Sequence, residues 1–600
     1  MIQSWKKISH LLLNKDRKRL VWLLLPMSLT ALINVFGIAL MMPFLSVVSE
    51  PGIIKTNASF LFLYNFLNFT DVRQFSIALG FLAFMMLILT NSFATFTTWV
   101  SSRVVADIRA RISQTLYAIY LDKPYEFHLN HNSSTLVNNL FQLTASFTNG
   151  FILQGMVMLT NIISIVAITS LILIINPLMA FIALLTMGGA FGVLFYSVKR
   201  TLASGGALMV MESEAGLKLA QESFGGIKDI KLKGSESVFK SMMFPRLKAM
   251  NRFSAFQQML LTMPRYGLEI IAFGGVIGMV LTMLVAGKTI TNIVPIVAVY
   301  VYAGYRLMPA MQSLFQAIGN IKVAQSSLDK VYDSIVANKE SLEQVESASK
   351  THITFAKMFQ LSGLSYVYPG FNREVLKNIN LKISHNEIVG IIGETGSGKT
   401  TLIDIVLGLL EPTNGAISID GVVLNNQSKV AAWQSMVGYV PQHIYLSDNS
   451  IADNIAFGED PSKVDRQAVI EAAKVAAIHD FIDGQLESGY DTMVGERGIK
   501  LSGGQIQRIG IARALYRNPK VLILDEATSS LDNQTEGDVM QAIYNMRNKM
   551  TMIIVAHRLS TLACCDRVLL LKNGVVADEG KLSELSTRHK GFDLQLENIS

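Results

Sequence analysis

Cysteine is almost absent from this sequence of 600 residues: it has only two, Cys564 and Cys565, and they are adjacent. Two neighbouring thiols cannot build a disulfide framework, so the small disulfide-stabilised secreted domains are excluded. Charged residues are also scarce, at 16%, whereas apolar residues make up 50% and the mean hydropathy is positive, at +0.37. A chain of this length needs more than one domain, and its composition indicates membrane segments.

Basic patches typical of a nucleic-acid-binding face are lacking as well. Residues 1–350 hold 29 Lys and Arg against 17 Asp and Glu, and residues 351–600 hold 23 against 28. In the basic half, the cations flank long apolar runs, as expected of loops beside a bilayer. Nucleic acid is therefore excluded as a partner, and the two halves are expected to differ in kind.

Six apolar runs are each long enough to cross a hydrocarbon core, which requires roughly 20 helical residues. They lie at about 20–48, 75–100, 149–175, 178–198, 257–287 and 290–312. The first run is too long for a removable signal peptide and lacks a small-residue cleavage site, so we expect it to stay as a span. The sequence thus predicts six transmembrane helices.

The positions of Lys and Arg orient these helices. Basic residues precede the first run, in "KKISHLLLNKDRKR", and fill the connections between runs 2 and 3 and between runs 4 and 5. The 1–2 and 5–6 connections hold only Lys55, Arg73 and Lys288. Because Lys and Arg stay on the cytoplasmic side, both termini are predicted to be inside. The two basic connections keep a helical period and are expected to be helices that continue beyond the membrane.

The segment "EIVGIIGETGSGKTTLIDIVLGLL" has the order strand, glycine loop, helix. Gly393, Gly396 and Gly398 let backbone N–H groups approach a phosphate closely, and the start of the helix supplies positive potential. We expect Lys399 to meet the β- and γ-phosphates and Thr400 to ligate Mg²⁺. The loop therefore predicts ATP and Mg²⁺ as cofactors. Its further candidate nucleotide-binding residues are Ser397 and Thr401.

The second half alternates short β-branched runs with helical ones, which is typical of an α/β domain. We therefore predict a polytopic α-helical membrane domain over 1–312, with long cytoplasmic extensions, and a helical linker over 313–350. An α/β P-loop ATPase domain is predicted over 351–600. In this domain the apolar run of "VLILDEATSSLD" ends on Asp525, which suits holding magnesium, and Glu526, which suits polarising the attacking water as a general base.

Six motifs between residues 352 and 590 together resemble the nucleotide-binding domain of ABC transporters. They are "GETGSGKTT", "LSGGQIQR", "VLILDEATSSLD", Gln442 in "YVPQHIYLSDNSIADNI", His557 in "IVAHRLST" and Tyr368 in "YVYPG". The resemblance implies that Tyr368 stacks on adenine and that His557 contacts the γ-phosphate as a catalytic residue. It also implies that Gln442 senses both the magnesium ion and the attacking water.

In this family the segment that corresponds to "LSGGQIQR" (501–508), called the signature segment below, faces the glycine loop of a second copy. The resemblance thus implies that Ser502, Gly503, Gly504 and Gln505, at the start of a helix with exposed N–H groups, contact the γ-phosphate held by another chain. Since the chain has one membrane half and one ATPase half, the working unit is expected to contain two chains. The intact motifs favour a homodimer that hydrolyses ATP in both pockets, and a partner encoded elsewhere is the alternative.

Six spans fused to a C-terminal ATPase domain resemble ABC exporters rather than importers. Charged residues inside spans are costly and so indicate a transport pathway. Arg265 lies in the fifth run and Arg306 in the sixth, ~33 Å and ~22 Å from the outer ends at helical rise. They could hold a phosphate or pyrophosphate head group. The alternative is an i,i+4 pair of Arg265 with Glu269, and bracing of a neighbouring helix by Arg306.

The stretches "PRY", "YRLMP" and "SFLFLYNFLNF" resemble the bacterial lipid-linked oligosaccharide flippases. This likeness implies ATP-driven flipping of a polyprenyl-pyrophosphate-linked oligosaccharide, by alternating access, across a bacterial inner membrane. The third stretch is too short to span and is expected to lie on the outer membrane face. The second run departs from the expected clamp because it has no Lys or Arg from 74 to 100. Export of another lipid, drug or peptide is the alternative, and an ATP-gated channel or regulator is a more distant one.

Overall fold

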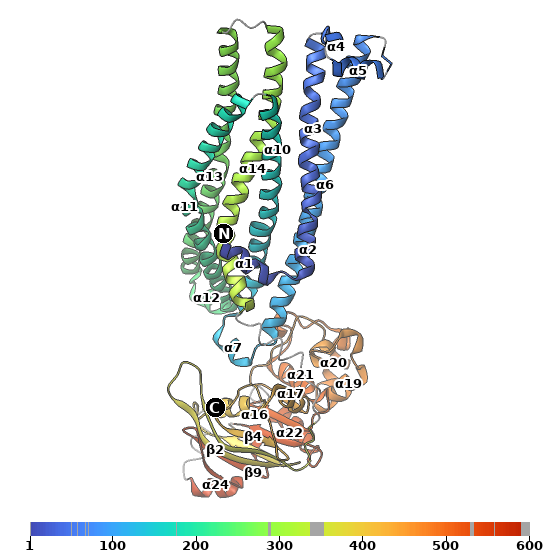
Figure 1. The fold of residues 1–600 in the computed structure, drawn as a ribbon. Coiled ribbons are helices and arrows are strands. Elements are labelled where there is room, and N and C mark those ends of the chain that lie inside the picture. The colour runs from blue at the N-terminus through green and yellow to red at the C-terminus, as the bar shows by residue number, and fades with distance from the viewer. Residues whose placement is uncertain are drawn as a thin grey trace. The chain divides into compact units, whose positions relative to one another are not determined.

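The computed structural model describes residues 2–49, 51–56, 58–66, 68–69, 71–175, 177–285, 290–336, 353–527, 533–556 and 559–589. The chain divides into two compact units, coloured from blue to red along the sequence in Figure 1. The first contains Met1–Lys123 and His128–Glu343, and the second contains Pro124–Phe127 and Gln344–Ser600. The tetrapeptide Pro124–Phe127 thus belongs to the second unit, although the chain on either side of it belongs to the first.

Helices make up the described part of the first unit, and one of them, α7, begins within the tetrapeptide that belongs to the second unit. In chain order they are α1 (Ile2–Leu11), α2 (Asn14–Trp22), α3 (Leu24–Ser49), α4 (Ile53–Thr56), α5 (Ala58–Phe66), α6 (Val72–Leu121), α7 (Tyr125–Asn130), α8 (Ser133–Asn138), α9 (Thr144–Phe147), α10 (Gln154–Ile175), α11 (Pro177–Gly225), α12 (Ile227–Lys233), α13 (Glu236–Val285) and α14 (Ile290–Val336). Two π-helical turns, Asn139–Leu143 and Thr148–Leu153, interrupt the stretch from α8 to α10.

The long helices exceed the thickness of a bilayer. The helices α6 and α13 each have 50 residues, which corresponds to about 75 Å at 1.5 Å per residue, whereas a hydrocarbon core measures about 30 Å. They must therefore continue beyond the membrane, as the helical period of the basic connections predicts. Among the described residues, four helical stretches are long and apolar enough to span: 14–37, 72–121, 133–174 and 236–278.

The helix α14 occupies the middle of the bundle and packs against α3, α10, α11 and α13 (Figure 1). Apolar side chains of these helices form the core, and Phe315 at its centre is 1% exposed. Polar groups also join helices: the Asn161 amide donates to the hydroxyl of Ser313 at 2.9 Å, and Lys7 pairs with Asp329 at 2.5 Å. The sixth predicted run thus forms the first half of α14, the helix that contacts α3, α10, α11 and α13.

Two sheets form the second unit. The strands are β1 (Met358–Val367), β2 (Glu374–Ser384), β3 (Ile388–Ile392), β4 (Asn414–Ile419), β5 (Val422–Val423), β6 (Val437–Val440), β7 (Val521–Asp525), β8 (Thr551–Val555), β9 (Arg567–Lys572) and β10 (Val575–Gly580). The larger sheet has the order β10-β9-β3-β8-β7-β6, with only β10 antiparallel to its neighbour, and the smaller, antiparallel sheet has the order β2-β1-β4-β5.

All residues of β3, β7 and β8 are buried, because these central strands are covered on both faces. Successive side chains point to opposite faces, so Ile388 and Ile392 join one core while Val389 and Ile391 join the other. The helices around the sheets are α16 (Lys399–Val406), α17 (Gln427–Gln434), α18 (Ile451–Ile455), α19 (Arg466–Val475), α20 (His479–Gln485), α21 (Gly503–Leu515), α22 (Asn533–Tyr544), α23 (Leu559–Leu562) and α24 (Leu582–Arg588). The carboxyl ends of β3 and β7 therefore share one edge of the sheet, where the candidate site lies.

Candidate active site

The glycine loop runs from the end of β3 to the start of α16. Gly396 and Gly398 have φ values of 81° and 102°, in the left-handed region that a residue with a Cβ rarely adopts. A Cβ on Gly393 would lie 2.2 Å from the carbonyl oxygen of Leu571 on β9. Glycine is thus required at all three predicted positions, and the backbone of the loop is free to approach a ligand.

Lys399 binds two backbone carbonyls of this loop. Its side-chain amine donates hydrogen bonds to the carbonyl oxygens of Gly393 at 2.6 Å and Glu394 at 3.2 Å, and the residue is only 9% exposed. Burial lowers the pKa of Lys399, whereas the carboxylates of Glu526 and Asp525 act in the opposite direction. The amine therefore contacts the loop carbonyls, and the charges of the acidic residues at the end of β7 act on it.

The geometry of the loop fits a phosphate and a magnesium ion. The hydroxyl oxygen of Ser397 is buried and has no hydrogen-bond partner among the described residues, so the loop contains a polar group that a ligand would satisfy. Thr400 is exposed at the first position after Lys399. Within the described residues, no group of three or more His, Cys, Asp or Glu could hold a metal ion. Mg²⁺ usually binds through one or two protein ligands together with phosphate and water, and the exposed Thr400 hydroxyl could supply one of them.

Three predicted residues meet at the end of β7. The Gln442 side-chain amide donates to the Oε2 atom of Glu526 at 2.6 Å, although the two residues are 84 positions apart. Glu526 adopts a φ of 50°, and its backbone N–H donates to the carbonyl oxygen of Val555 at 3.0 Å. A left-handed conformation in a non-glycine residue is uncommon and strained. It turns the chain sharply after Asp525, which is 6% exposed, and places the Glu526 carboxylate beside Gln442.

Tyr368 is fixed beside the loop by two contacts. Its hydroxyl and that of Thr401 lie 3.1 Å apart, and its ring meets the ring of Tyr366 edge to face with 5.0 Å between centroids. The Tyr366 hydroxyl donates to the Oε1 atom of Glu126, at 2.8 Å, within the same compact unit. Burial, followed by this carboxylate, raises the pKa of Tyr366. Sequence reasoning did not find Tyr366 or Glu126, which lie 240 positions apart.

The signature segment forms the start of α21. Ser502 is the N-cap: its hydroxyl accepts from the backbone N–H of Gln505, while the Gln505 side chain accepts from the N–H of Ser502 at 2.7 Å. The N–H groups of Gly503 and Gly504 belong to the first turn, which has no intrahelical acceptor. Among the described residues, no hydrogen bond or ion pair joins residues 501–505 to the glycine loop. The remaining predicted catalytic residue, His557, lies outside the described residues.

The predicted substrate residues lie in two helices. Arg265, on α13, pairs through Nε with Oε1 of Glu269 at 2.9 Å, and its side chain is 54% exposed. The i,i+4 ion pair given above as the alternative to head-group binding is thus formed, and it uses one of the five N–H groups of the guanidinium. Arg306 lies on α14, but its side chain is outside the described part of the structure.

Asp404 is a site residue that sequence reasoning missed. It lies on α16, one turn after Thr400, and burial together with the charge of Asp525 raises its pKa from 3.8 to about 6. Burial also raises the pKa of Tyr439 on β6, and the carboxylates of Asp525 and Asp404 raise it further. The available signal was an acidic residue inside the apolar run "LIDIVLGLL".

We expect Asp404→Asn to stabilise the nucleotide-free protein above pH 6. Because the folded-state pKa is raised, stability is lost as pH rises from about 4 to 6, and it is not regained at higher pH. After allowance for solvent screening at this half-buried position, the gain at pH 7.5 should be about 1 kcal/mol, or ~2–4 °C in Tm. Thermal unfolding at pH 4 and 7.5 measures it, with the exposed Asp448→Asn as control. A gain of equal size at both values would contradict the prediction.

Comparison with known proteins agrees with this site. Residues 376–529 match the family model described as ABC transporter. Over 288 residues, the chain is 40% identical to ABC transporter B family member 14 of Arabidopsis thaliana, covering 48% of this chain and 22% of that protein. The chain thus spans less than a quarter of the length of this curated relative. The second unit therefore contains an ATPase domain of the ABC transporter family, which confirms the resemblance noted in the motifs.

The likeness extends to the membrane half. The chain is 27% identical over 504 residues to the ATP-dependent lipid A-core flippase of Salmonella typhimurium, covering 82% of each, and 28% identical over 514 residues to that of Escherichia coli K12, covering 84% of each. The structure of a bacterial Atm1-family ABC exporter with ATP bound matches 97% of this chain and 98% of that one, with a TM-score of 0.74 and 23% identity. The chain has the fold of an ABC exporter, with a helical membrane region and an ATPase domain.

Proposed function

We propose that two copies of this chain form an ATP-driven exporter that moves an amphiphilic, lipid-linked substrate from the inner to the outer leaflet of a bacterial inner membrane. Relatives that match more than four fifths of the chain are named ATP-dependent lipid A-core flippases. The proposed unit has six spans per chain within residues 1–312, the linker 313–350 and the ATPase domain 351–600. Its finer substrate class is a polyprenyl-pyrophosphate-linked oligosaccharide.

The observation that carries the substrate class is the half-exposed Arg265 on an apolar helix. A guanidinium within a span is costly, and such residues face a cavity or pathway. The contact with Glu269 uses only the Nε–H group of the guanidinium. A phosphate or pyrophosphate would accept hydrogen bonds from the other four N–H groups. We propose that Arg306, from the neighbouring α14, contributes the second cation to this head group.

ATP hydrolysis is proposed to require both chains. Lys399 and the N–H groups of the glycine loop bind the phosphates, Thr400 and Asp525 hold Mg²⁺, and Tyr368 supports the adenine. Bound Mg²⁺ would neutralise phosphate charge during transfer. Glu526 accepts a proton from the attacking water while Gln442 orients that carboxylate, with which it shares a 2.6 Å hydrogen bond. The exposed start of α21 then completes the pocket of the partner chain, so nucleotide binding draws the ATPase domains together.

The proposal is tested with purified protein in proteoliposomes. ATP hydrolysis and flipping are measured with a defined polyprenyl-pyrophosphate sugar, with generic phospholipids and with amphiphilic dyes. We expect flipping of the first and stimulation of hydrolysis by it alone. Transport of the dyes or of generic lipids at equal rates would favour the broader exporter, and ion currents would favour a channel.

Arg265→Ala and Arg306→Ala should each reduce flipping of the pyrophosphate lipid at least tenfold more than they reduce basal ATP hydrolysis. The reason is that each removes charge-assisted bonds to the head group. Glu269→Gln distinguishes head-group binding by Arg265 from a structural role of its ion pair, because this substitution breaks the ion pair but leaves the Arg265 cation in place. It should preserve flipping, whereas loss equal to that of Arg265→Ala would mean that the pair is structural. Arg252→Ala, an exposed position on the same helix, is the control.

A further inference from the structure

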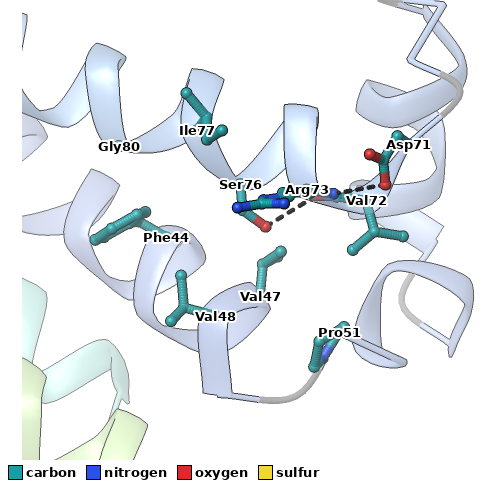
Figure 2. A pocket seen from close by; sticks show the side chains of 10 residues that line it. All are labelled: Phe44, Val47, Val48, Pro51, Asp71, Val72, Arg73, Ser76, Ile77 and Gly80. Carbon is teal, nitrogen blue, oxygen red and sulfur yellow. Dashed lines mark hydrogen bonds between the residues drawn. The ribbon is translucent and has the colours of Figure 1, made fainter.

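An open cavity of about 690 Å³ lies between α3 and α6 (Figure 2), at the ends of these helices that α4 and α5 connect (Figure 1). Its walls are mostly apolar and include Phe44 and Val48 from α3 and Ile77 from α6. A Cβ on Gly80 would lie 2.9 Å from the ring of Phe44, so this glycine lets the ring pack against α6 at one end of the cavity. The cavity belongs to neither the ATP site nor the proposed cargo site.

Among the described residues that line this cavity, Arg73 is the cation and Asp71 the anion. Figure 2 shows the side chain of Arg73 leaving α6 on the side that faces Phe44 and Val47. The nearby Asp71 is the N-cap of α6 and accepts from the backbone N–H of Arg73 at 3.0 Å. Within the described residues, the guanidinium of Arg73 has no carboxylate within 4.0 Å and no hydrogen-bond acceptor. Its charge therefore has no partner among these residues, beside an apolar hollow.

The position of Arg73 along α6 corresponds to a lipid head group. The next basic residue on this helix is Arg103, and 30 residues of α-helix separate the two by ~45 Å. This is the thickness of a bilayer with both head-group regions included, about 40–45 Å. Arg73 lies in the connection between the first two spans, which the distribution of basic residues places outside. Ile77 and Gly80 lie ~6 and ~10 Å deeper along the helix, at the level of acyl chains.

Aromatic side chains beside the cavity support this placement. Tyr64 on α5 contacts Phe75 on α6 edge to face, with 5.4 Å between ring centroids, and so anchors α5 to the helical end. Phe62 and Phe66 are stacked on one another on the exposed side of α5, at 68% and 72% exposure. Exposed aromatic side chains on a short helix at a helix end are typical of a segment lying in the membrane interface.

We propose that the cavity between α3 and α6 binds one anionic phospholipid of the outer leaflet. The Arg73 guanidinium donates paired hydrogen bonds to the lipid phosphate, and one acyl chain lies against Phe44, Val48 and Ile77. The site selects a lipid with a net negative charge, because the head group of a zwitterionic lipid contains a cation that already compensates its phosphate. This inference concerns a resident lipid on the outer side, so it stands apart from the identity of the cargo.

The test is native mass spectrometry of the full-length protein, without nucleotide or cargo, after titration with phosphatidylglycerol or phosphatidylcholine of identical acyl chains. Wild type should retain phosphatidylglycerol about fivefold more strongly at this site, the effect of one basic residue on an anionic lipid. Arg73→Ala should abolish the preference and Arg73→Lys should keep part of it. Ile77→Trp, which fills the cavity from an exposed position, should lower the retention of both lipids.

Gln74→Ala is the matched control, because Gln74 is exposed beside Arg73 on α6 and does not line the cavity. Gel filtration and thermal unfolding report whether each variant folds. Undiminished retention of phosphatidylglycerol by Arg73→Ala, or equal retention of both lipids by wild type, would overturn the proposal. Competition by soluble glycerol phosphate as effective as that by the lipid would also overturn it, since the site would then bind a free anion. None of these outcomes depends on whether the protein flips a lipid-linked sugar.

Discussion

Glu526→Gln should reduce the rate of ATP hydrolysis by a factor of about 10²–10⁴ while nucleotide binding is preserved. A positioned general base contributes an acceleration of this size, and an amide cannot accept the proton of the attacking water. The substitution keeps the size of the side chain and an oxygen that can accept from Gln442, whose amide now donates to Oε2 at 2.6 Å. The glycine loop and Lys399 are unchanged, so the affinity for ATP should stay within about threefold.

Steady-state phosphate release and equilibrium binding of a fluorescent ATP analogue separate these two effects. Glu471→Gln, an exposed carboxylate on α19, serves as the control and should hydrolyse ATP at the wild-type rate. Hydrolysis by Glu526→Gln within tenfold of wild type would exclude Glu526 as the base. Equal loss of hydrolysis and binding would instead indicate that the strained turn at φ 50° had been disturbed.

The glycine loop could be predicted from the sequence because its constraint is local. Gly396 and Gly398 need left-handed backbone, and the buried strand before them and the helix after them follow from the pattern of neighbouring residues. The pair of Arg265 and Glu269 could be anticipated for the same reason, since residues four apart share a helix face. Spacing along the chain is sufficient information for features of this kind.

Features that depend on packing between distant segments were not predictable in this way. The sequence does not reveal that Asp404 is buried beside Asp525, so that first burial and then the charge of Asp525 raise its pKa, or that Tyr366 reaches Glu126. Arg513 is a further case. It belongs to α21, five residues after the signature motif, where a basic residue is expected to face solvent, yet its guanidinium donates hydrogen bonds to the backbone of Asn454 and Tyr445.

Arg513 joins α21 to the segment that follows Gln442. Its Nε donates to the backbone carbonyl oxygen of Asn454 at 2.7 Å, and its Nη1 donates to that of Tyr445 at 2.8 Å. The guanidinium lies over the ring of Phe457, 4.8 Å from the centroid. Burial lowers the pKa of Arg513 to about 10, so the side chain is still charged at neutral pH. Two backbone carbonyls, that of Tyr445 in the loop after β6 and that of Asn454 in α18, thus depend on one cation.

Arg513→Ala should destabilise the ATPase domain by about 3 kcal/mol, because hydrogen bonds to a charged group are lost and carbonyl oxygens lose their donors. Thermal unfolding should show a decrease in Tm of roughly 6–12 °C, and Arg513→Lys, which keeps the charge but not the fork of donors, should be intermediate. Arg517→Ala is the control: this residue pairs with Glu459 at 2.7 Å on the surface, where a pair contributes less than about 1 kcal/mol. If both alanine variants melt within 2 °C of wild type, Arg513 does not hold the segment after Gln442, and the position of Gln442 must depend on its contact with Glu526.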